Sequence, residues 1–196
     1  WLRAEEVAEA AAAHRRHYAR YGVAGCELLS GAAEAIGAVH AAGGRGLVVT
    51  AKSTPLAEAV LERPGFGVDE VIGHRWGPTK GDALTERGAD VYVGDHTADI
   101  VAAHHCGAVA VAVASGPIDA AALHEAGADV VLASLDGFGV WLNSWLRAER
   151  LARLERRLRE LGSVMVAFSG GADSAFLLAA TVLAAVPEAR HLPVPR

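Results

Sequence analysis

Between residues 46 and 132, short apolar runs alternate with segments of helical character, and this alternation constrains the fold more than any other feature. The apolar runs are continuous, as in the stretch GLVVT. Continuous runs of Val, Ala and Leu are typical of parallel strands buried on both faces, and such strands need helical crossovers. We predict strands at 46–50, 70–72, 89–93, 108–113 and 129–132, with helices at 55–62, 80–87, 97–106 and 118–126. The pattern therefore predicts an α/β fold with a Rossmann-like, three-layer parallel sheet.

Further segments flank this region on both sides. Helices are expected at 5–20 and 32–42 before it, and at 140–161 after it. In the last of these, leucines at 151, 154, 158 and 161 form a stripe at helical spacing, which predicts packing on a neighbour. A strand at Val164–Phe168 and a helix at 175–185 should follow. Because the chain starts with Trp1 and ends in a Pro-rich tail, 191–196, we interpret it as a fragment of a longer protein.

The composition excludes several function classes. The chain is 52% hydrophobic and 21% charged, so it can bury a core. A net charge of −5 gives no electrostatic reason to expect nucleic acid or an acidic membrane as a partner. No apolar run is long enough to span a bilayer, and no signal peptide is visible. Cys26 and Cys106 lack metal-ligand spacing and form no disulfide framework, so we expect a cytoplasmic protein of undetermined oligomeric state.

Two carboxylates follow one of the predicted strands in the stretch VGDHTADI. Asp95 should lie at the carboxyl end of the strand, where parallel sheets bind ligands, and Asp99 one helical turn later on the same side. Two such carboxylates can hold Mg²⁺, which prefers oxygen ligands. The alternative is a structural role, since an Asp near a helix N-terminus can accept hydrogen bonds from free N–H groups and interacts favourably with the helix dipole. His96 lies between the two and could contact a substrate.

Two further residues at predicted strand or helix ends favour the ligand-binding alternative. Thr50 ends the first predicted strand, where its hydroxyl and nearby backbone N–H groups, such as that of Ala51, can bind a phosphoryl oxygen. Lys80 opens a helix at the same edge of the sheet, so its ammonium can neutralise phosphate charge. A hydroxyl, a lysine and an acidic metal site are what phosphoryl transfer requires. Lys52 is expected only to line the rim of this site.

These motifs resemble those of the haloacid dehalogenase superfamily. LVVTAK, GPTKGDAL and VGDHTADIVAAHHCG resemble its motifs II, III and IV over residues 1–140, with the phosphoglycolate phosphatase and β-phosphoglucomutase-like branch as the most similar type. The resemblance implies a core at 32–140 and a remnant of a helical cap at 1–31. It also implies that Thr50 binds the substrate phosphate, that Lys80 stabilises a phosphoaspartyl intermediate, and that Asp95 and Asp99 hold Mg²⁺.

One departure from this pattern matters for activity. The family's nucleophile and its acid/base partner lie in a DxDxT motif on the first strand, and no such motif occurs in the 196 residues. Without a nucleophilic Asp we expect no phosphatase turnover from this chain. The resemblance places that strand between 46–50 and 89–93, so its absence should leave two unpaired sheet edges. Val164–Phe168 could fill the gap.

A glycine-rich loop, SGGADS, follows the last predicted strand. It resembles the pyrophosphate-binding PP-loop of ATP pyrophosphatases, and residues 147–185 resemble the start of ATP-dependent sacrificial sulfur transferases. The resemblance implies a connecting helix at 141–161 and a truncated PP-loop domain at 162–196, with possible ATP binding. Glycines let backbone N–H groups approach a phosphate at a helix N-terminus. The implied phosphate contacts are Ser169, Gly170, Gly171, Asp173 and Ser174.

The favoured interpretation is that the parent protein hydrolyses a small phosphorylated metabolite with the help of Mg²⁺. The 196-residue chain itself is then expected to be an inactive fragment of that protein. Two alternatives remain open. The parent could be an adenylating sulfur transferase in which the dehalogenase-like part is accessory, or the chain could be a non-catalytic fragment. The remaining histidines, such as His104 and His105, are expected to have packing or solvent-exposed roles.

Overall fold

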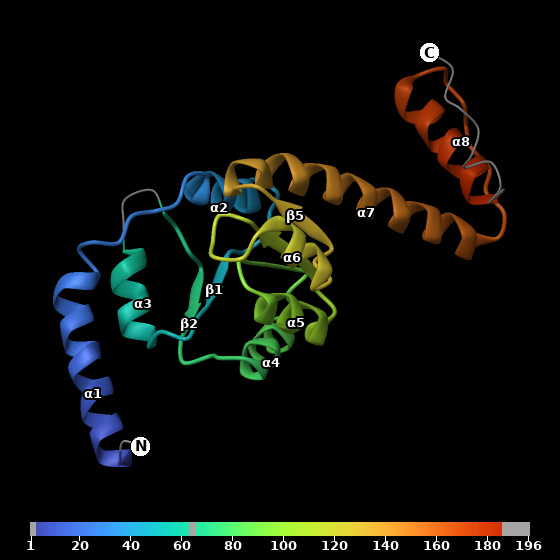
Figure 1. Ribbon diagram of the computed structural model, residues 1–196. Helices are drawn as coiled ribbons and strands as arrows, with labels where there is room; N and C mark the ends of the chain where they lie inside the picture. The colour runs from blue at the N-terminus through green and yellow to red at the C-terminus, as the bar shows by residue number, and fades with distance from the viewer. Residues whose placement is uncertain (1–2, 63–65, 186–196) are drawn as a thin grey trace. The chain divides into compact units, whose positions relative to one another are not determined.

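The structure is a computed structural model, and it describes residues 3–62 and 66–185 (Figure 1). The predicted Pro-rich tail lies outside the described residues. Internal contacts divide the chain into a first unit up to Gly139 and a second unit from Val140. The helices of the first unit are α1 (Ala4–His17), α2 (Ala32–Ala41), α3 (Thr54–Leu61), α4 (Pro78–Arg87), α5 (Thr97–Cys106) and α6 (Ala120–Glu125), with a π-helical turn at Tyr18–Gly22 and a 3₁₀ turn at Leu135–Gly137. Its strands are β1 (Leu47–Val49), β2 (Glu70–Ile72), β3 (Val91–Gly94), β4 (Val109–Val113) and β5 (Val130–Leu132).

The predicted alternation of strands and helices is confirmed. The bounds of β2 and α5 agree with the prediction, and most others differ by one or two residues. The helix that carries Lys80 begins earlier than expected, at Pro78. Proline is favoured in the first turn because its fixed φ suits a helix and its missing N–H would be unpaired there. Lys80 is therefore the third residue of α4.

In the part of the chain that the structure describes, all strand pairs are parallel, and they form two sheets. β1 pairs with β2, with Val48 opposite Val71, and β4 lies between β3 and β5, with Val111 opposite both Val93 and Val130. Within the described residues, no strand pairs with the second edge of β1 or of β3. The break falls at the place where the sequence motifs implied an absent strand.

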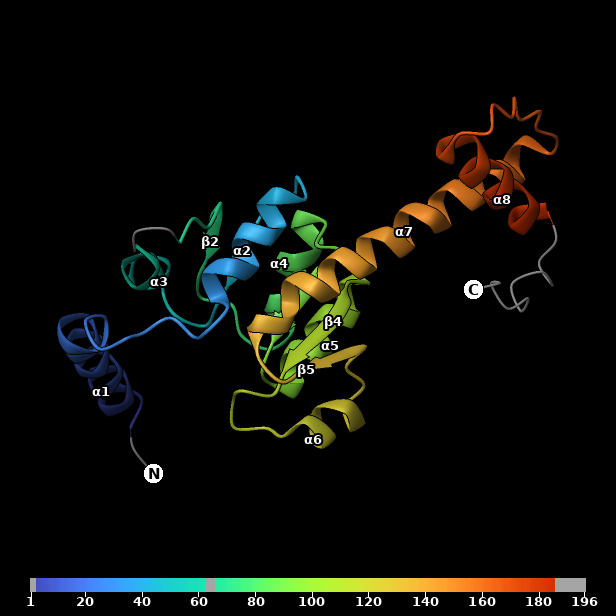
Figure 2. The same cartoon turned by 90° about the horizontal axis from the view of Figure 1, so that it is seen from above.

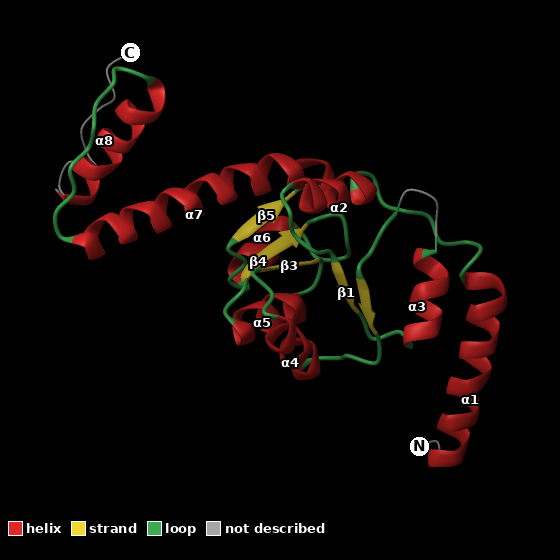
Figure 3. Cartoon of the chain, turned by 180° about the vertical axis from the view of Figure 1, so that it is seen from behind, coloured by secondary structure: helices red, strands yellow, loops and turns green. Residues whose placement is uncertain are grey.

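The core of the first unit lies around β4. Ala110 and Ala112 point to one face of this strand and pack with Ile100 and Ala103 of α5 and Leu123 of α6. Small side chains on the strand let these helices approach closely. Helices α4 and α5 lie on one side of the strands and α2 on the other, which gives the predicted three layers (Figures 1 and 3). The fold class predicted from the sequence is confirmed.

The second unit contains most of α7 (Phe138–Leu161) and all of α8 (Ala172–Ala185), seen from above in Figure 2. The leucine stripe packs as predicted in part, because Leu158 is buried with Ala180 and Ala184 while Leu161 is 54% exposed. No described helix is long and apolar enough to cross a bilayer.

The predicted strand at Val164–Phe168 is wrong. These residues form no strand, and Met165 is 98% exposed. A strand is stabilised by hydrogen bonds to a neighbouring strand, and Val164 instead contacts the α7–α8 cluster around Leu158. The segment therefore does not supply a strand that could fill the gap.

Candidate functional site

The connection between β3 and α5 carries the two predicted carboxylates. His96 is the N-cap of α5, and its Nδ1 accepts a hydrogen bond from the backbone N–H of Ala98 at 3.1 Å. The capping role that the sequence left open for Asp95 and Asp99 thus belongs to the histidine between them. Both carboxylates are consequently available for other contacts.

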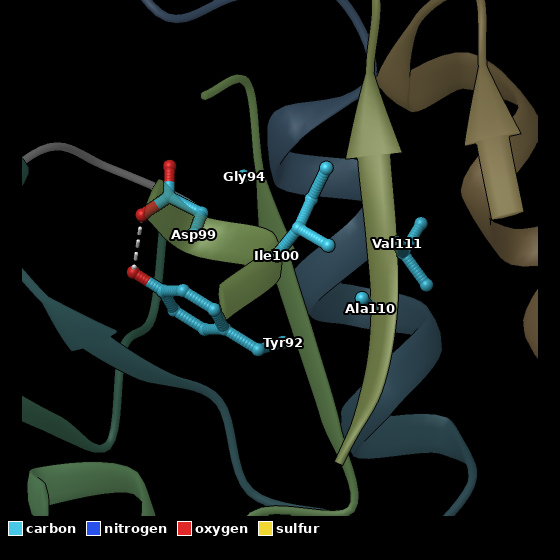
Figure 4. A pocket seen from close by; sticks show the side chains of 6 residues that line it. All are labelled: Tyr92, Gly94, Asp99, Ile100, Ala110 and Val111. Carbon is cyan, nitrogen blue, oxygen red and sulfur yellow. Dashed lines mark hydrogen bonds between the residues drawn. The ribbon is translucent and has the colours of Figure 1, made fainter. Parts of the chain in front are cut away.

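Asp99 forms a buried ion pair with Lys80. The Lys80 ammonium donates to Asp99 Oδ1 at 2.6 Å, and the side chains are 16% and 10% exposed. The hydroxyl of Tyr92 donates to the same oxygen at 3.2 Å, and Figure 4 shows the two side chains pointing toward each other. Gly94 lies so close to the Asp99 carboxylate that a Cβ at this position would collide with it. The structure thus brings together two of the predicted site residues, from α4 and α5.

Tyr92 is a site residue that the sequence analysis did not identify. Burial raises the pKa of its hydroxyl above the ordinary value, and the negative charge of Asp99 adds to the effect. The phenol therefore stays neutral and acts as a hydrogen-bond donor to Asp99. It had no distinctive signal in the sequence, because an aromatic residue within an apolar strand is most simply a core residue.

Asp95 differs from Asp99 in exposure. It is exposed at the end of β3, and its carboxylate lies against Gly116, where a Cβ would approach Asp95 Oδ2 to 2.5 Å. No described residue forms a hydrogen bond or an ion pair with the Asp95 carboxylate. The described residues contain no cluster of three or more His, Cys, Asp or Glu side chains suited to a metal ion.

Thr50 lies one residue beyond the end of β1, as predicted. Its backbone N–H donates to the carbonyl of Ile72 at 3.0 Å, and its hydroxyl accepts the backbone N–H of Lys52 at 3.2 Å. No hydrogen bond joins Thr50 to Lys80, Asp95 or Asp99 within the described residues. The link between them is α4, because Ala83 and Leu84 of this helix pack with Val49 at the end of β1.

The turn between β2 and α4 was not predicted as part of a site. Arg75 donates its backbone N–H to the carbonyl of Thr50 at 2.9 Å, so this turn lies beside the predicted phosphate-binding residue. The Nε of Arg75 is buried and has no hydrogen-bond partner among the described residues. His74 adopts a φ of 56°, which is unusual for a residue other than glycine.

The predicted loop SGGADS lies at the start of α8. Gly170 has a φ of 79°, a conformation that favours glycine. The hydroxyls of Ser169 and Ser174 are 3.2 Å apart, and Ser174 Oγ donates to the carbonyl of Gly171 at 3.0 Å. Asp173 is in the first turn of α8. All five predicted residues are therefore close together around one turn.

The three-layer parallel architecture, with polar residues at the strand ends, defines the class as an α/β protein with a Rossmann-like core. A family model described as haloacid dehalogenase-like hydrolase matches residues 2–104, which is more than half of the chain. The chain belongs to this family. The resemblance stated from the motifs is thereby confirmed at the level of the family and of its hydrolase type.

Solved structures of similar fold agree with this family. A predicted phosphatase from Clostridium acetobutylicum has a TM-score of 0.63 and 18% identity, over 73% of this chain and 72% of the other. A haloacid dehalogenase-like family hydrolase from Streptococcus pneumoniae gives 0.59 and 16%, over 74% and 72%. A candidate phosphoglycolate phosphatase from Lactobacillus delbrueckii subsp. bulgaricus gives 0.56 and 20%, over 70% and 62%. Comparison of the sequence with curated proteins gave no match.

Proposed function

We propose that this chain carries the phosphate-binding and metal-binding part of a phosphomonoesterase site, and that the parent protein hydrolyses a small phosphorylated metabolite. The observation that carries the proposal is the buried ion pair between Lys80 and Asp99. Removing two charges from water is unfavourable unless their geometry is good, so stability alone is a weak reason for such a pair. A phosphoryl-binding site gives the lysine a function at this position.

Each residue then has a distinct role. The Thr50 hydroxyl and the backbone N–H of Ala51 bind phosphoryl oxygens at the end of β1. The Lys80 ammonium neutralises negative charge that develops on the phosphoryl group. Tyr92 and Asp99 position Lys80 through the shared Oδ1. The Lactobacillus neighbour is described as a candidate phosphoglycolate phosphatase, and we extend membership of that branch to this chain as part of the proposal.

The acidic residues fit a magnesium ion. Asp95 offers an exposed carboxylate without a partner among the described residues, and Asp99 has its Oδ2 outside the two hydrogen bonds that end on Oδ1. Mg²⁺ commonly takes one or two protein carboxylates and completes its shell with water and phosphate oxygens. When bound, the ion supplies charge neutralisation at the phosphoryl group. The small pocket lined by Asp99, Ile100 and Ala110 is too small to hold a water molecule, so it is not the site of the ion.

The proposal predicts binding without turnover, because the 196 residues contain no DxDxT motif. Titration calorimetry with inorganic phosphate and Mg²⁺ should show binding to the wild type. Thr50→Val should weaken it about tenfold, as expected for one lost hydrogen bond to a charged group. Thr85→Val is the matched control, since the Thr85 hydroxyl donates to the Gly81 carbonyl of its own helix and, among the described residues, to no residue of the site.

Two results would contradict the proposal. Equal phosphate binding by the wild type and Thr50→Val would remove Thr50 from the site. Mg²⁺-dependent hydrolysis of p-nitrophenyl phosphate, lost in Asp95→Asn, would show that the chain has a nucleophile of its own.

We also propose that SGGADS binds pyrophosphate or the phosphates of ATP, as in an adenylating sulfur transferase. The left-handed Gly170 and the facing hydroxyls of Ser169 and Ser174 support this second candidate. Titration with pyrophosphate should show binding that Ser174→Ala weakens. Binding that Ser174→Ala and Asp173→Ala leave unchanged would place the anion elsewhere.

A further inference from the structure

The turn at residues 73–75 is held firmly against the segment that follows β1. Three consecutive backbone N–H groups donate to that segment. They join Gly73 N to Thr54 Oγ1 (3.1 Å), His74 N to Lys52 O (2.8 Å) and Arg75 N to Thr50 O (2.9 Å). A turn with this many hydrogen bonds has a defined position relative to Thr50.

The turn also adopts an unfavourable conformation. His74 has a φ of 56°, and a Cβ at Gly73 would collide with the backbone N of Thr54 and approach the Lys52 carbonyl to 2.7 Å. Strained backbone of this kind persists when surrounding contacts require it, and it is concentrated at functional sites. The strained conformation of His74 thus occurs in the turn that holds the backbone of the next residue, Arg75, beside Thr50.

Among the described residues, the Arg75 side chain lacks the partners that its charge requires. Its Nε is buried without a hydrogen-bond acceptor, and no described carboxylate forms an ion pair with it. A guanidinium is always protonated and can only donate, so an unmade hydrogen bond to a buried Nε is costly. Nearby Lys52 also has no carboxylate partner within the described residues, and its ammonium lies 5.6 Å from the centre of the Tyr18 ring.

The charges at this end of the strands are therefore divided. On the α4–α5 side, Lys80 is neutralised by Asp99. On the β1–β2 side, Arg75 and Lys52 leave two positive charges without a described counter-charge. A phosphoryl group at Thr50 and Lys80 leaves the Arg75 guanidinium free for another anion.

We propose that Arg75 is a substrate-binding residue that holds a second anionic group of the phosphorylated substrate. The inference rests on the proposed function, because it takes the phosphoryl group to be at Thr50. The guanidinium matches carboxylate or phosphate oxygens with two parallel hydrogen bonds, which a lysine cannot reproduce. The preferred substrates thus carry an anionic group beside the phosphate ester.

Paired probes test this directly. Glycerol 3-phosphate and 3-phosphoglycerate have the same phosphate ester, but only the second carries a carboxylate. By calorimetry in the presence of Mg²⁺, the wild type should bind 3-phosphoglycerate about tenfold more tightly or better. Arg75→Gln should bring the two affinities together, because it weakens the binding of 3-phosphoglycerate more than that of glycerol 3-phosphate. The control Arg45→Gln removes the same charge at the other end of β1, where Arg45 pairs with Glu70, and should keep the preference.

A spectroscopic measurement covers the case in which Arg75→Gln fails to fold. In the ¹⁵N-labelled wild type, 3-phosphoglycerate should shift the Arg75 Nε–H resonance and slow its exchange with water, whereas glycerol 3-phosphate should not. Equal affinities for the two probes in the wild type, or an unchanged Nε–H resonance, would overturn the role of Arg75. If neither probe binds, the result would instead contradict the proposed function on which the inference rests.

Discussion

At the scale of single residues, Asp99 shows how burial decides the role of a side chain. It lies in the first turn of α5, where a carboxylate is normally favourable because of the helix dipole. Its side chain is nevertheless directed to Lys80 and Tyr92. Because the residue is only 8% exposed, an unpaired carboxylate there would be costly. The positive charge of Lys80 stabilises it more than a neutral backbone N–H could.

The capping of α5 by His96 gives a prediction at the same scale. Replacing His96 by Ala removes the acceptor for the Ala98 N–H and should lower the free energy of unfolding by about 1 kcal/mol. His96→Asn restores a good capping acceptor and should keep the wild-type stability. Urea unfolding at pH 7 measures both. Equal destabilisation by the two substitutions would mean that the ring packs rather than caps.

The sequence predicted the site residues unevenly, for physical reasons. Thr50, Lys80 and Asp95 could be located because each follows or opens an element that apolar patterning defines. Tyr92 could not, because an aromatic residue within an apolar strand is most simply a core residue. Arg75 could not, because its place beside Thr50 depends on a contact between segments distant in sequence. Most of the fold was predictable from local patterning, whereas a strand at Val164–Phe168 would have needed a partner strand that the pattern of one segment does not reveal.

At the scale of elements, two aspartates join helices to neighbouring strands in the same way. Asp69 precedes β2, accepts the backbone N–H of Gly46 at 2.7 Å, and lies 2.9 Å from His40 Nε2. Asp129 precedes β5, accepts the N–H of Ala110 at 2.7 Å, and lies 3.1 Å from His104 Nε2. Each of these two carboxylates thus bonds both to a helix and to the backbone of the adjacent parallel strand or, at Gly46, of the residue just before it.

These contacts predict how stability depends on pH. Hydrogen bonds lower the pKa of both carboxyls, mainly from His40 at Asp69 and from the Ala110 N–H at Asp129. A lowered pKa in the folded state contributes stability that is present above the unfolded-state pKa, near 4, and is lost as pH falls through the folded value.

The double variant Asp69→Asn and Asp129→Asn should therefore lose less stability than the wild type between about pH 5 and pH 2. Urea unfolding across this range measures the difference. Asp119→Asn is a control that changes a capping carboxylate outside the strand pairs. Parallel curves for the double variant and the wild type would show that these two groups do not contribute to acid unfolding.

At the scale of the whole molecule, the separation into two sheets should be visible in dynamics. β4 is paired on both sides and almost fully buried, whereas all residues of β3 are half-buried. Within the first unit, the two sheets are linked through the cluster that joins α4, α5 and Val49. Neither β1 nor β3 carries the charge or proline that usually protects an exposed edge.

Hydrogen exchange tests this picture. Amides of β4 should exchange last. Amides of β1 and β3 should exchange earlier, because one edge of each of these strands has no partner strand among the described residues. Thermal unfolding of the chain should accordingly be broad. Exchange of β1, β3 and β4 in a single cooperative step would instead indicate one continuous sheet in solution.

We propose that residues from both sheets form one site for phosphate and metal. Thermodynamic coupling between the two ligands tests this, because coupling is reciprocal and the opposite charges of Mg²⁺ and phosphate in one site favour the binding of both. We predict that saturating Mg²⁺ increases the affinity for inorganic phosphate about tenfold in the wild type, in line with typical couplings of about 1–3 kcal/mol. Asp95→Asn should abolish the increase, whereas Asp90→Asn, at the other end of β3, should preserve it. Phosphate binding that is independent of Mg²⁺, or coupling that survives in Asp95→Asn, would contradict a shared site for the two ligands.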